Sequence, residues 1–198
     1  MRRLQTLLFV CYPLAVHLAL ISSQTDWALW LLVALSLSQL LTLLGTSGSA
    51  RWVALIPALV LTLSIIGLLR GSVLALYLPP IFISGGLLWL FASTLRDGHE
   101  PIISRFARLG FQEDEPEQLR YTRRVTRVWS LFFLAMLLET VLLSVFAPLE
   151  LWSLFANILN YLFVALLFVL EFAYRRLRFP QRTPLKKFVQ QLIATDWP

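Results

Sequence analysis

Residues 128–170 decide the fold of this protein and read, in turn, VWSLFFLAMLLETVLLSVF, APLE and LWSLFANILNYLFVALLFVL. Two apolar runs, 128–146 and 151–170, each have about the 20 residues that a helix needs to cross a bilayer. In lipid such runs form helices, because their backbone groups find no other hydrogen-bond partner. Only four residues connect the runs. The pattern therefore predicts an antiparallel pair of transmembrane helices.

Four more apolar runs precede this pair, at 4–22, 27–45, 52–69 and 73–93. Hydrophobic residues make up 58% of the 198 residues, well above the usual content of a soluble domain. We therefore predict an all-α, polytopic membrane helical bundle of six transmembrane helices in a 4+2 arrangement, with amphipathic interfacial helices. The expected regions are a four-helix transmembrane region (1–94), a cytoplasmic charged loop with an interfacial helix (95–127), a transmembrane helical hairpin (128–174) and a basic cytoplasmic tail with an amphipathic helix (175–198).

The basic residues predict the orientation in the membrane. With six spans and both termini in the cytoplasm, 16 of the 17 lysines and arginines fall on the inner side, and Arg70 alone falls on the outer side. This bias follows the positive-inside rule. The expected location is the bacterial inner (plasma) membrane. The net charge of +6 is then explained by orientation and anionic lipid headgroups, so membrane lipids are expected partners and nucleic acid is not.

Two segments have the spacing of helices that lie along the membrane surface. Ile102, Ile103, Phe106 and Leu109 form a short apolar stripe after Pro101, which we expect to contact the inner leaflet. Residues 185–193 form a second stripe with lysines on the opposite face. We expect this stripe to lie at the membrane interface, although it could equally dock on the protein's own inner surface or on a partner. Residues 119–127 are expected to continue as a helix into the fifth span.

The charged block 95–127 contains seven arginines, six carboxylates and one histidine. Arginines on adjacent helical turns can bind phosphates or carboxylates bidentately. They can equally maintain the topology and pair with the acidic stretch 113–117 or with headgroups, and the sequence leaves both open. The candidate cytoplasmic binding residues are Arg96, His99, Glu100, Arg105, Arg120, Arg123 and Arg124.

Few ionisable residues lie inside the spans, where they are costly and often functional. Glu139 lies seven residues before the end of the fifth span, and Asn157 lies six residues after the start of the sixth. At about 1.5 Å per residue both are about 10 Å below the outer surface, and His17 is at a similar depth. We expect His17, Glu139 and Asn157, with Asn160 one turn away, to form a polar cluster. Such a cluster can relay protons or simply hold helices together.

Catalytic motifs are not found at the spacing that their chemistry needs. There is no H-E-x-x-H, G-x-S-x-G or Walker sequence, and Ser104 stands where an H-x4-D acyltransferase starting at His99 would have its aspartate. No catalytic residue, cofactor or metal site is therefore assigned, and Cys11 has no second cysteine to pair with. A weaker hypothesis is a membrane-embedded acyl or phospho transferase that uses His99 and Glu100.

Four short blocks of the sequence carry a resemblance: LRDGHEPIISRFA (95–107), YTRRVT (121–126), WSLFAN (152–157) and EFAYRR (171–176). They resemble a family of small inner-membrane proteins of Gram-negative bacteria, often encoded beside the fatty-acid-synthase-like enzymes of aryl polyene and xanthomonadin-type pigments. The resemblance covers roughly residues 85–180. It implies a pathway with acyl carrier proteins and lipid-like products, and it assigns no residue a role.

The preferred hypothesis is a non-enzymatic membrane protein that supports assembly or handling of a lipid-like, aryl polyene type product. Its arginine-rich cytoplasmic face would dock an acidic acyl carrier protein or acyl-processing enzyme, since basic surfaces steer acidic partners. The alternative is a small transporter or flippase subunit that uses His17, Glu139 and Asn157.

Overall fold

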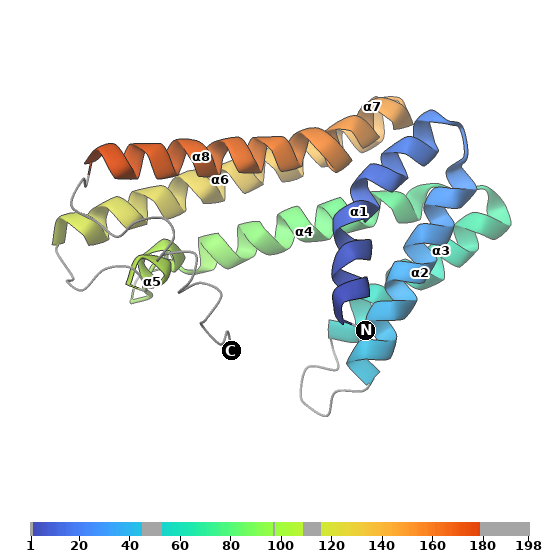
Figure 1. The fold of residues 1–198 in the computed structure, drawn as a ribbon, viewed down its shortest axis with the longest axis horizontal. Coiled ribbons are helices and arrows are strands. Elements are labelled where there is room, and N and C mark those ends of the chain that lie inside the picture. Colours follow the sequence, from blue (N-terminus) through green and yellow to red (C-terminus); the bar gives the residue numbers. More distant parts are fainter. Residues whose placement is uncertain (1, 45–52, 97, 109–115, 179–198) are drawn as a thin grey trace. The chain divides into compact units, whose positions relative to one another are not determined.

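The computed structural model describes residues 2–44, 53–96, 98–108 and 116–178, and every regular element along these ranges is a helix (Figure 1). The helices are α1 (Arg2–Ile21), α2 (Thr25–Leu44), α3 (Leu55–Arg70), α4 (Leu74–Ser93), α5 (Ile102–Arg108), α6 (Pro116–Phe146), α7 (Leu149–Leu154), the π-helical turn η2 (Phe155–Leu159) and α8 (Asn160–Arg178). The predicted all-α class is therefore confirmed. The predicted helix at 185–193 lies outside the described residues.

The number of long apolar helices differs from the prediction. In the described part of the chain four helices are long and apolar enough to cross a membrane, not six: Thr25–Leu43, Leu74–Ser93, Leu119–Phe146 and Leu149–Arg178. The third predicted span corresponds to α3, which has 16 residues and is about 24 Å long, short of a hydrocarbon layer of about 30 Å. The first corresponds to α1, a helix of 20 residues, whose described side chains form a shorter apolar stretch, Cys11–Ile21. The coarser conclusion, a multi-pass membrane protein, agrees with four such helices.

Helix α6 confirms the prediction that residues 119–127 continue into the fifth span. It begins at Pro116, where the fixed φ of proline suits a first helical position, and runs 31 residues without interruption. After the short connection at Ala147 and Pro148, α7, η2 and α8 follow each other directly from Leu149 to Arg178. A hydrogen bond between Asn160 and Glu139 and ring stacking between Tyr121 and Tyr174 join the two arms of this hairpin.

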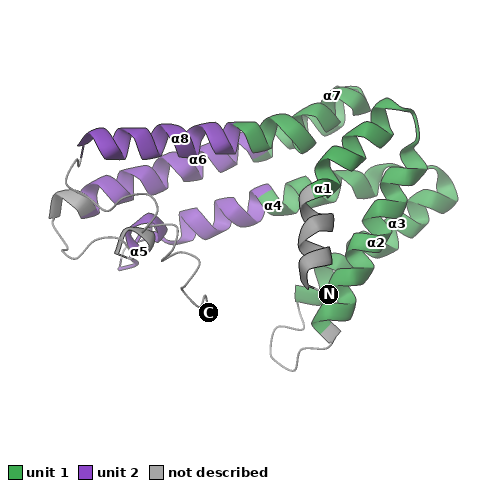
Figure 2. Ribbon diagram, in the orientation of Figure 1, with its two compact units in different colours: residues 1–83, 137–162 green, residues 84–136, 163–198 purple. Residues whose placement is uncertain are grey.

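The chain forms two compact units, coloured in Figure 2. Unit 1 contains residues 1–83 and 137–162, and unit 2 contains residues 84–136 and 163–198. Helices α4, α6 and α8 each contribute one part to either unit. The boundaries of these two units differ from the boundaries of the four regions expected from hydropathy. The four regions stay predictions.

The core of unit 1 joins α1, α2, α3 and the start of α4 to α7 and η2. Its buried residues are Val16, Leu20, Ala28, Leu29, Leu32, Val60, Ala75, Leu76, Trp152 and Ala156. Trp152 is the largest of these side chains, and its ring meets Tyr77 edge to face at 4.6 Å. At the end of α3, Gly71 adopts a left-handed φ of 67°, which suits glycine at a helix C-cap and turns the chain towards α4.

The core of unit 2 is aromatic. Trp129 and Phe133 of α6 pack against Phe91 of α4, with ring centroids 5.1–6.0 Å apart. Ile103 of α5 packs against the same cluster. Ile103 belongs to the stripe that was predicted to contact the inner leaflet. In the structure it contacts the core of unit 2 instead.

Many large apolar side chains are exposed along the long helices, among them Leu131, Leu138, Leu166 and Val169. A soluble protein rarely exposes large contiguous apolar surfaces, whereas a lipid solvent accommodates them. Their distribution supports placing these helices in a membrane.

Candidate functional site

Unit 1 contains two groups of hydrogen-bonded polar side chains between its helices. In the first group, His17 Nδ1 of α1 lies 3.1 Å from Ser153 Oγ of α7. Asn157 Nδ2 of η2 donates to the same Ser153 oxygen at 3.0 Å. Ser153 and Asn157 are buried. The three residues thus link α1 to the return arm of the hairpin.

The second group joins α6 to the start of α8. Asn160 Nδ2 donates to Glu139 Oε2 at 3.1 Å, and Thr140 Oγ1 is 3.4 Å from the same oxygen. Asn160 Nδ2 also lies 3.5 Å from Thr140 Oγ1. Glu139 Oε1 is buried and has no hydrogen-bond partner within the part of the chain that the structure describes.

The local backbone contributes to this arrangement. Residues 155–159 form a π-helical turn, in which hydrogen bonds close over five residues; such turns are rare and often occur at functional sites. Asn157 lies within this turn and Asn160 directly follows it. Both amide side chains are buried and point to polar partners, the first to Ser153 and the second to Glu139.

The predicted polar cluster is thus brought together in two parts. His17 and Asn157 share Ser153, while Glu139 is bonded to Asn160. Sequence reasoning missed Ser153 and Thr140. Ser153 stands four residues before Asn157 and Thr140 directly follows Glu139, so helical spacing and adjacency were the signals that could have identified them.

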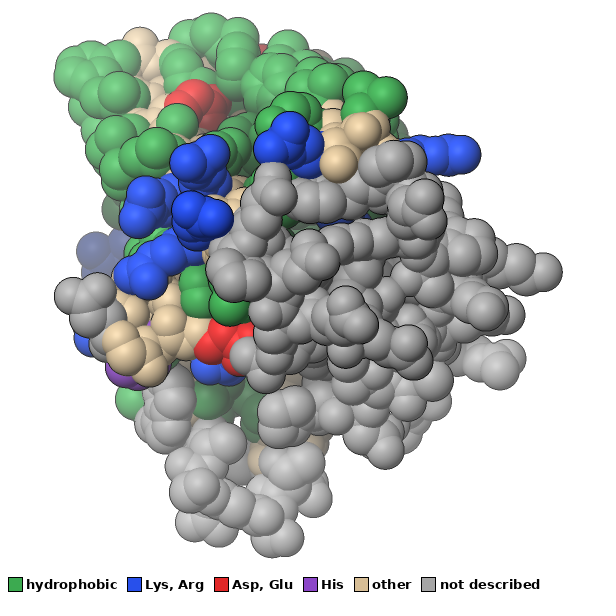
Figure 3. Space-filling view, turned by 90° about the vertical axis from the view of Figure 1, so that its left-hand side faces the viewer, with side chains coloured by type: hydrophobic (Ala, Val, Ile, Leu, Met, Phe, Trp, Pro, Cys, Tyr) green, Lys and Arg blue, Asp and Glu red, His purple; other side chains and the backbone are tan. Residues whose placement is uncertain are grey.

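Unit 2 contains all seven of the predicted cytoplasmic binding residues. The described side chains of this unit include nine arginines and two glutamates. Figure 3 shows basic side chains gathered beside apolar ones on one face. We call the exposed arginines of α6 and α8 the arginine surface: Arg120, Arg124, Arg127, Arg176 and Arg178.

The arginine surface continues the exposed apolar stripes of its two helices. On α6, the positions 120, 124 and 127 share one helical face with Leu131 and Leu134, which are exposed. On α8, the positions 166, 169, 173 and 176 share a face that changes from Leu166 and Val169 to Arg176. Arginines at the end of a lipid-facing stripe occupy the level of the headgroups.

The other predicted binding residues differ in their surroundings. Arg96, His99 and Arg105 are exposed and Glu100 is partly buried. Arg123 donates from its guanidinium to the Leu95 carbonyl oxygen at 3.0 Å. Arg123 therefore connects α6 to the turn that follows α4, and it does not belong to the arginine surface.

A carboxylate that sequence reasoning missed lies beside the arginine surface. Glu171 of α8 accepts a hydrogen bond from the Tyr121 hydroxyl at 3.2 Å and lies 3.7 Å from Arg175 Nε. The rings of Tyr121 and Tyr174 stack at 5.9 Å. Ser104 and Thr122, also missed, share a buried hydrogen bond of 2.6 Å that holds α5 against α6.

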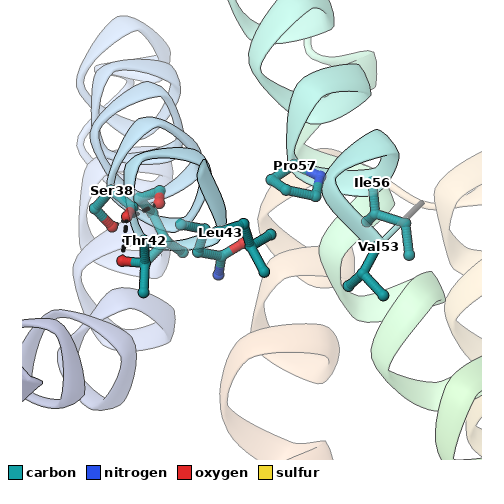
Figure 4. A pocket seen from close by; sticks show the side chains of 8 residues that line it. Ser38, Thr42, Leu43, Val53, Ile56 and Pro57 are labelled. Atoms are coloured by element: carbon teal, nitrogen blue, oxygen red, sulfur yellow. Dashed lines mark hydrogen bonds between the residues drawn. The ribbon is translucent and has the colours of Figure 1, made fainter. Parts of the chain in front are cut away.

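A groove of about 410 Å³ opens between α2 and α3 in unit 1 (Figure 4). The hydroxyls of Ser38 and Thr42 on its wall donate to the carbonyl oxygens of Leu35 and Ser38 in their own helix. Most of the remaining lining is aliphatic: Leu35, Leu43, Val53, Ile56 and Pro57, with Gln39 beside them. The groove thus offers mainly apolar contacts.

Comparison with known proteins found no matching family model, no similar curated protein and no similar solved structure.

Proposed function

We propose that this chain is an integral protein of the bacterial inner membrane that docks an acidic partner on its arginine surface. The partner is an acyl carrier protein or an acyl-processing enzyme, and the complex supports assembly or handling of a lipid-like, aryl polyene type product. The protein itself carries out no reaction in this proposal. Its termini and the arginine surface lie on the cytoplasmic side.

The distribution of charge in unit 2 carries the proposal. Unit 2 holds 13 of the 17 lysines and arginines and eight of the 11 carboxylates, an excess of five positive charges. This excess produces a positive field that attracts acidic proteins and speeds their association. Arg124, Arg127 and Arg176 are exposed, so a partner can reach their guanidinium groups. Arginine binds carboxylates and phosphates bidentately, which suits an acidic protein that carries a phosphate-linked acyl group.

We also propose that α1 and α3 cross the membrane together with the four longer helices. Helix α3 packs along α2 in unit 1, and Leu29 of α2 lies beside Gly67 of α3. A helix slightly shorter than the hydrocarbon layer is accommodated by local thinning of the bilayer. Six crossings put the Lys and Arg residues, Arg70 excepted, on the inner side as the positive-inside rule requires.

Docking can be measured with the full chain in nanodiscs of phosphatidylcholine, a lipid without net charge. We expect an acidic acyl carrier protein to bind saturably and to bind more weakly as salt screens the charges. Replacing Arg124, Arg127 and Arg176 together by Glu should weaken binding at least about tenfold, which corresponds to about 1.4 kcal/mol, because like charges now oppose the partner.

The control is Arg70→Glu, which makes the same charge reversal at one exposed arginine at the end of α3. It should leave docking within about twofold of the wild-type affinity, since Arg70 lies on the outer side of the membrane in the proposed topology. Equal affinity of the triple variant and the wild-type protein would exclude the arginine surface as the docking site. Binding that does not depend on salt would exclude an electrostatic mode of docking.

A further inference from the structure

Glu139 is the only ionisable residue between Val128 and Phe146, the most apolar part of α6. It lies seven residues before the end of the helix, or about 10 Å along its axis. An ionised side chain at such a depth is costly unless other groups compensate its charge. The contacts of the two carboxyl oxygens therefore indicate whether the side chain is ionised or protonated.

The two oxygens have different surroundings. Oε2 accepts a hydrogen bond from Asn160 at 3.1 Å and a longer one from Thr140 at 3.4 Å. Oε1 is buried and has no partner among the described residues. A carboxylate shares its charge over both oxygens, so an unpartnered buried Oε1 would carry uncompensated charge. A neutral carboxyl group has a carbonyl oxygen that accepts and a hydroxyl oxygen that carries the proton.

No positive charge compensates an ionised Glu139 in the described part of unit 1. His17, the nearest candidate by sequence analysis, is bonded to Ser153 instead. Asp26, Arg70 and Glu150 are exposed, and none of them is hydrogen-bonded or ion-paired to Glu139. The other ionisable side chains described in this unit are a thiol and phenols, which are never positively charged, and they do not bond to Glu139 either: Cys11, Tyr12, Tyr77 and Tyr161.

We propose that Glu139 is a proton-binding site within the membrane, with the proton on Oε1 and with Asn160 and Thr140 holding Oε2 as the accepting oxygen. The ligand of this site is a proton. A neutral carboxyl that can exchange its proton is the kind of group that proton-coupled membrane proteins use. The proposal does not depend on the arginine surface, so either one can fail without the other.

Small apolar molecules can approach the Glu139 side chain. Glu139 is partly exposed, and its neighbours Leu138 and Leu142 on α6 are 54% and 55% exposed and face lipid in a membrane. Dicyclohexylcarbodiimide, which dissolves in lipid, is therefore a suitable probe. A protonated carboxyl adds across one C=N bond of this reagent, its proton passing to a nitrogen and its oxygen to the central carbon. The acyl group then shifts to nitrogen and leaves a stable N-acylurea, with no leaving group.

We expect mass spectrometry of the full chain in nanodiscs at pH 7 to find one carbodiimide adduct, at Glu139. Glu139→Gln should remove the adduct. The matched control is Glu150→Gln, which changes an exposed carboxylate at the start of α7 and should leave the adduct in place. An adduct at Glu150 without one at Glu139, or equal labelling of Glu139 by a charged, water-soluble carbodiimide, would overturn the proposal.

Infrared spectroscopy provides a second readout that does not require the reagent to enter. The difference spectrum between wild type and Glu139→Gln should contain the carbonyl band of a neutral carboxyl group. Asn160→Leu should move that band to higher frequency, because Oε2 loses its shorter hydrogen bond. A structural role alone would not produce that shift. A carboxylate band in place of the carbonyl band would show that Glu139 is ionised and would overturn the proposal.

Discussion

Gly67 lies on the buried side of α3 next to α2, at a position with no room for a side chain. A Cβ atom there would collide with the carbonyl oxygen of Ser72 and would lie 3.3 Å from both terminal methyl groups of Leu29. The backbone oxygen belongs to the turn after α3, whose amide at Ser72 bonds back to the Gly67 carbonyl. The glycine therefore permits both the turn and the close packing of the two helices.

This close approach predicts a loss of stability for Gly67→Ala. The added methyl group must displace the turn, at a cost of about 1–3 kcal/mol. The free energy of unfolding in mixed micelles of detergent and sodium dodecyl sulfate measures the effect. Gly86→Ala is the matched control, because a Cβ atom at Gly86 meets nothing within 4 Å and alanine favours a helix by up to about 1 kcal/mol. Equal stabilities of the two variants would disprove the close approach.

Helices α1 and α7 are joined by one hydrogen bond of 3.1 Å between His17 and Ser153. Hydrogen bonds between membrane helices contribute on average about 0.6 kcal/mol. A double-mutant cycle of His17→Ala and Ser153→Ala should therefore give a coupling free energy of about 0.5–1 kcal/mol in unfolding experiments.

The control cycle pairs His17→Ala with Ser144→Ala. Ser144 lies near the end of α6 and its hydroxyl donates to the Val141 carbonyl oxygen of its own helix at 2.7 Å. We expect no coupling between His17 and Ser144. A coupling of equal size in both cycles would mean that the energy reflects general destabilisation and not the bond to Ser153.

The helices themselves were largely predictable, because length and apolarity are local properties of the sequence. The predicted runs at 27–45, 73–93, 128–146 and 151–170 correspond to α2, α4, the apolar part of α6 and the α7 to α8 arm. The apolar run at 52–69 became a 16-residue helix, which begins only at Leu55. Hydropathy is an average over a window of residues, so it does not show at which residue the first hydrogen-bonded turn of a helix begins.

The number of helices that cross the membrane determines on which side of it each loop of the molecule lies. Gln24, in the turn between α1 and α2, and Arg96, after α4, are both exposed. Helices α2, α3 and α4 connect them. If all three cross, the two residues lie on opposite sides, whereas they lie on the same side if α3 does not cross.

Cysteine labelling can decide between these topologies. Cys11 is the only cysteine of the chain, so Cys11→Ala gives a background for Gln24→Cys and Arg96→Cys. We expect a maleimide that cannot pass the inner membrane to label Gln24→Cys in intact cells and Arg96→Cys only after lysis. Labelling of both from the same side would refute the crossing of α3, and labelling of Arg96→Cys alone in intact cells would refute the proposed orientation.

The sequence alone determined that the chain is helical, is apolar enough for a membrane and contains a tight helical hairpin. It also indicated that the polar residues of neighbouring helices lie at similar depths. These properties follow from apolarity, run length and a fixed rise per residue. Only the tertiary structure decided that Glu139 bonds to Asn160 and that His17 and Asn157 share Ser153. The physical reason is that the depth of a residue in the membrane follows from its position along the helix. The direction of its side chain depends instead on the rotation of the helix about its axis. Helix packing and the π-helical turn at 155–159 determine that rotation.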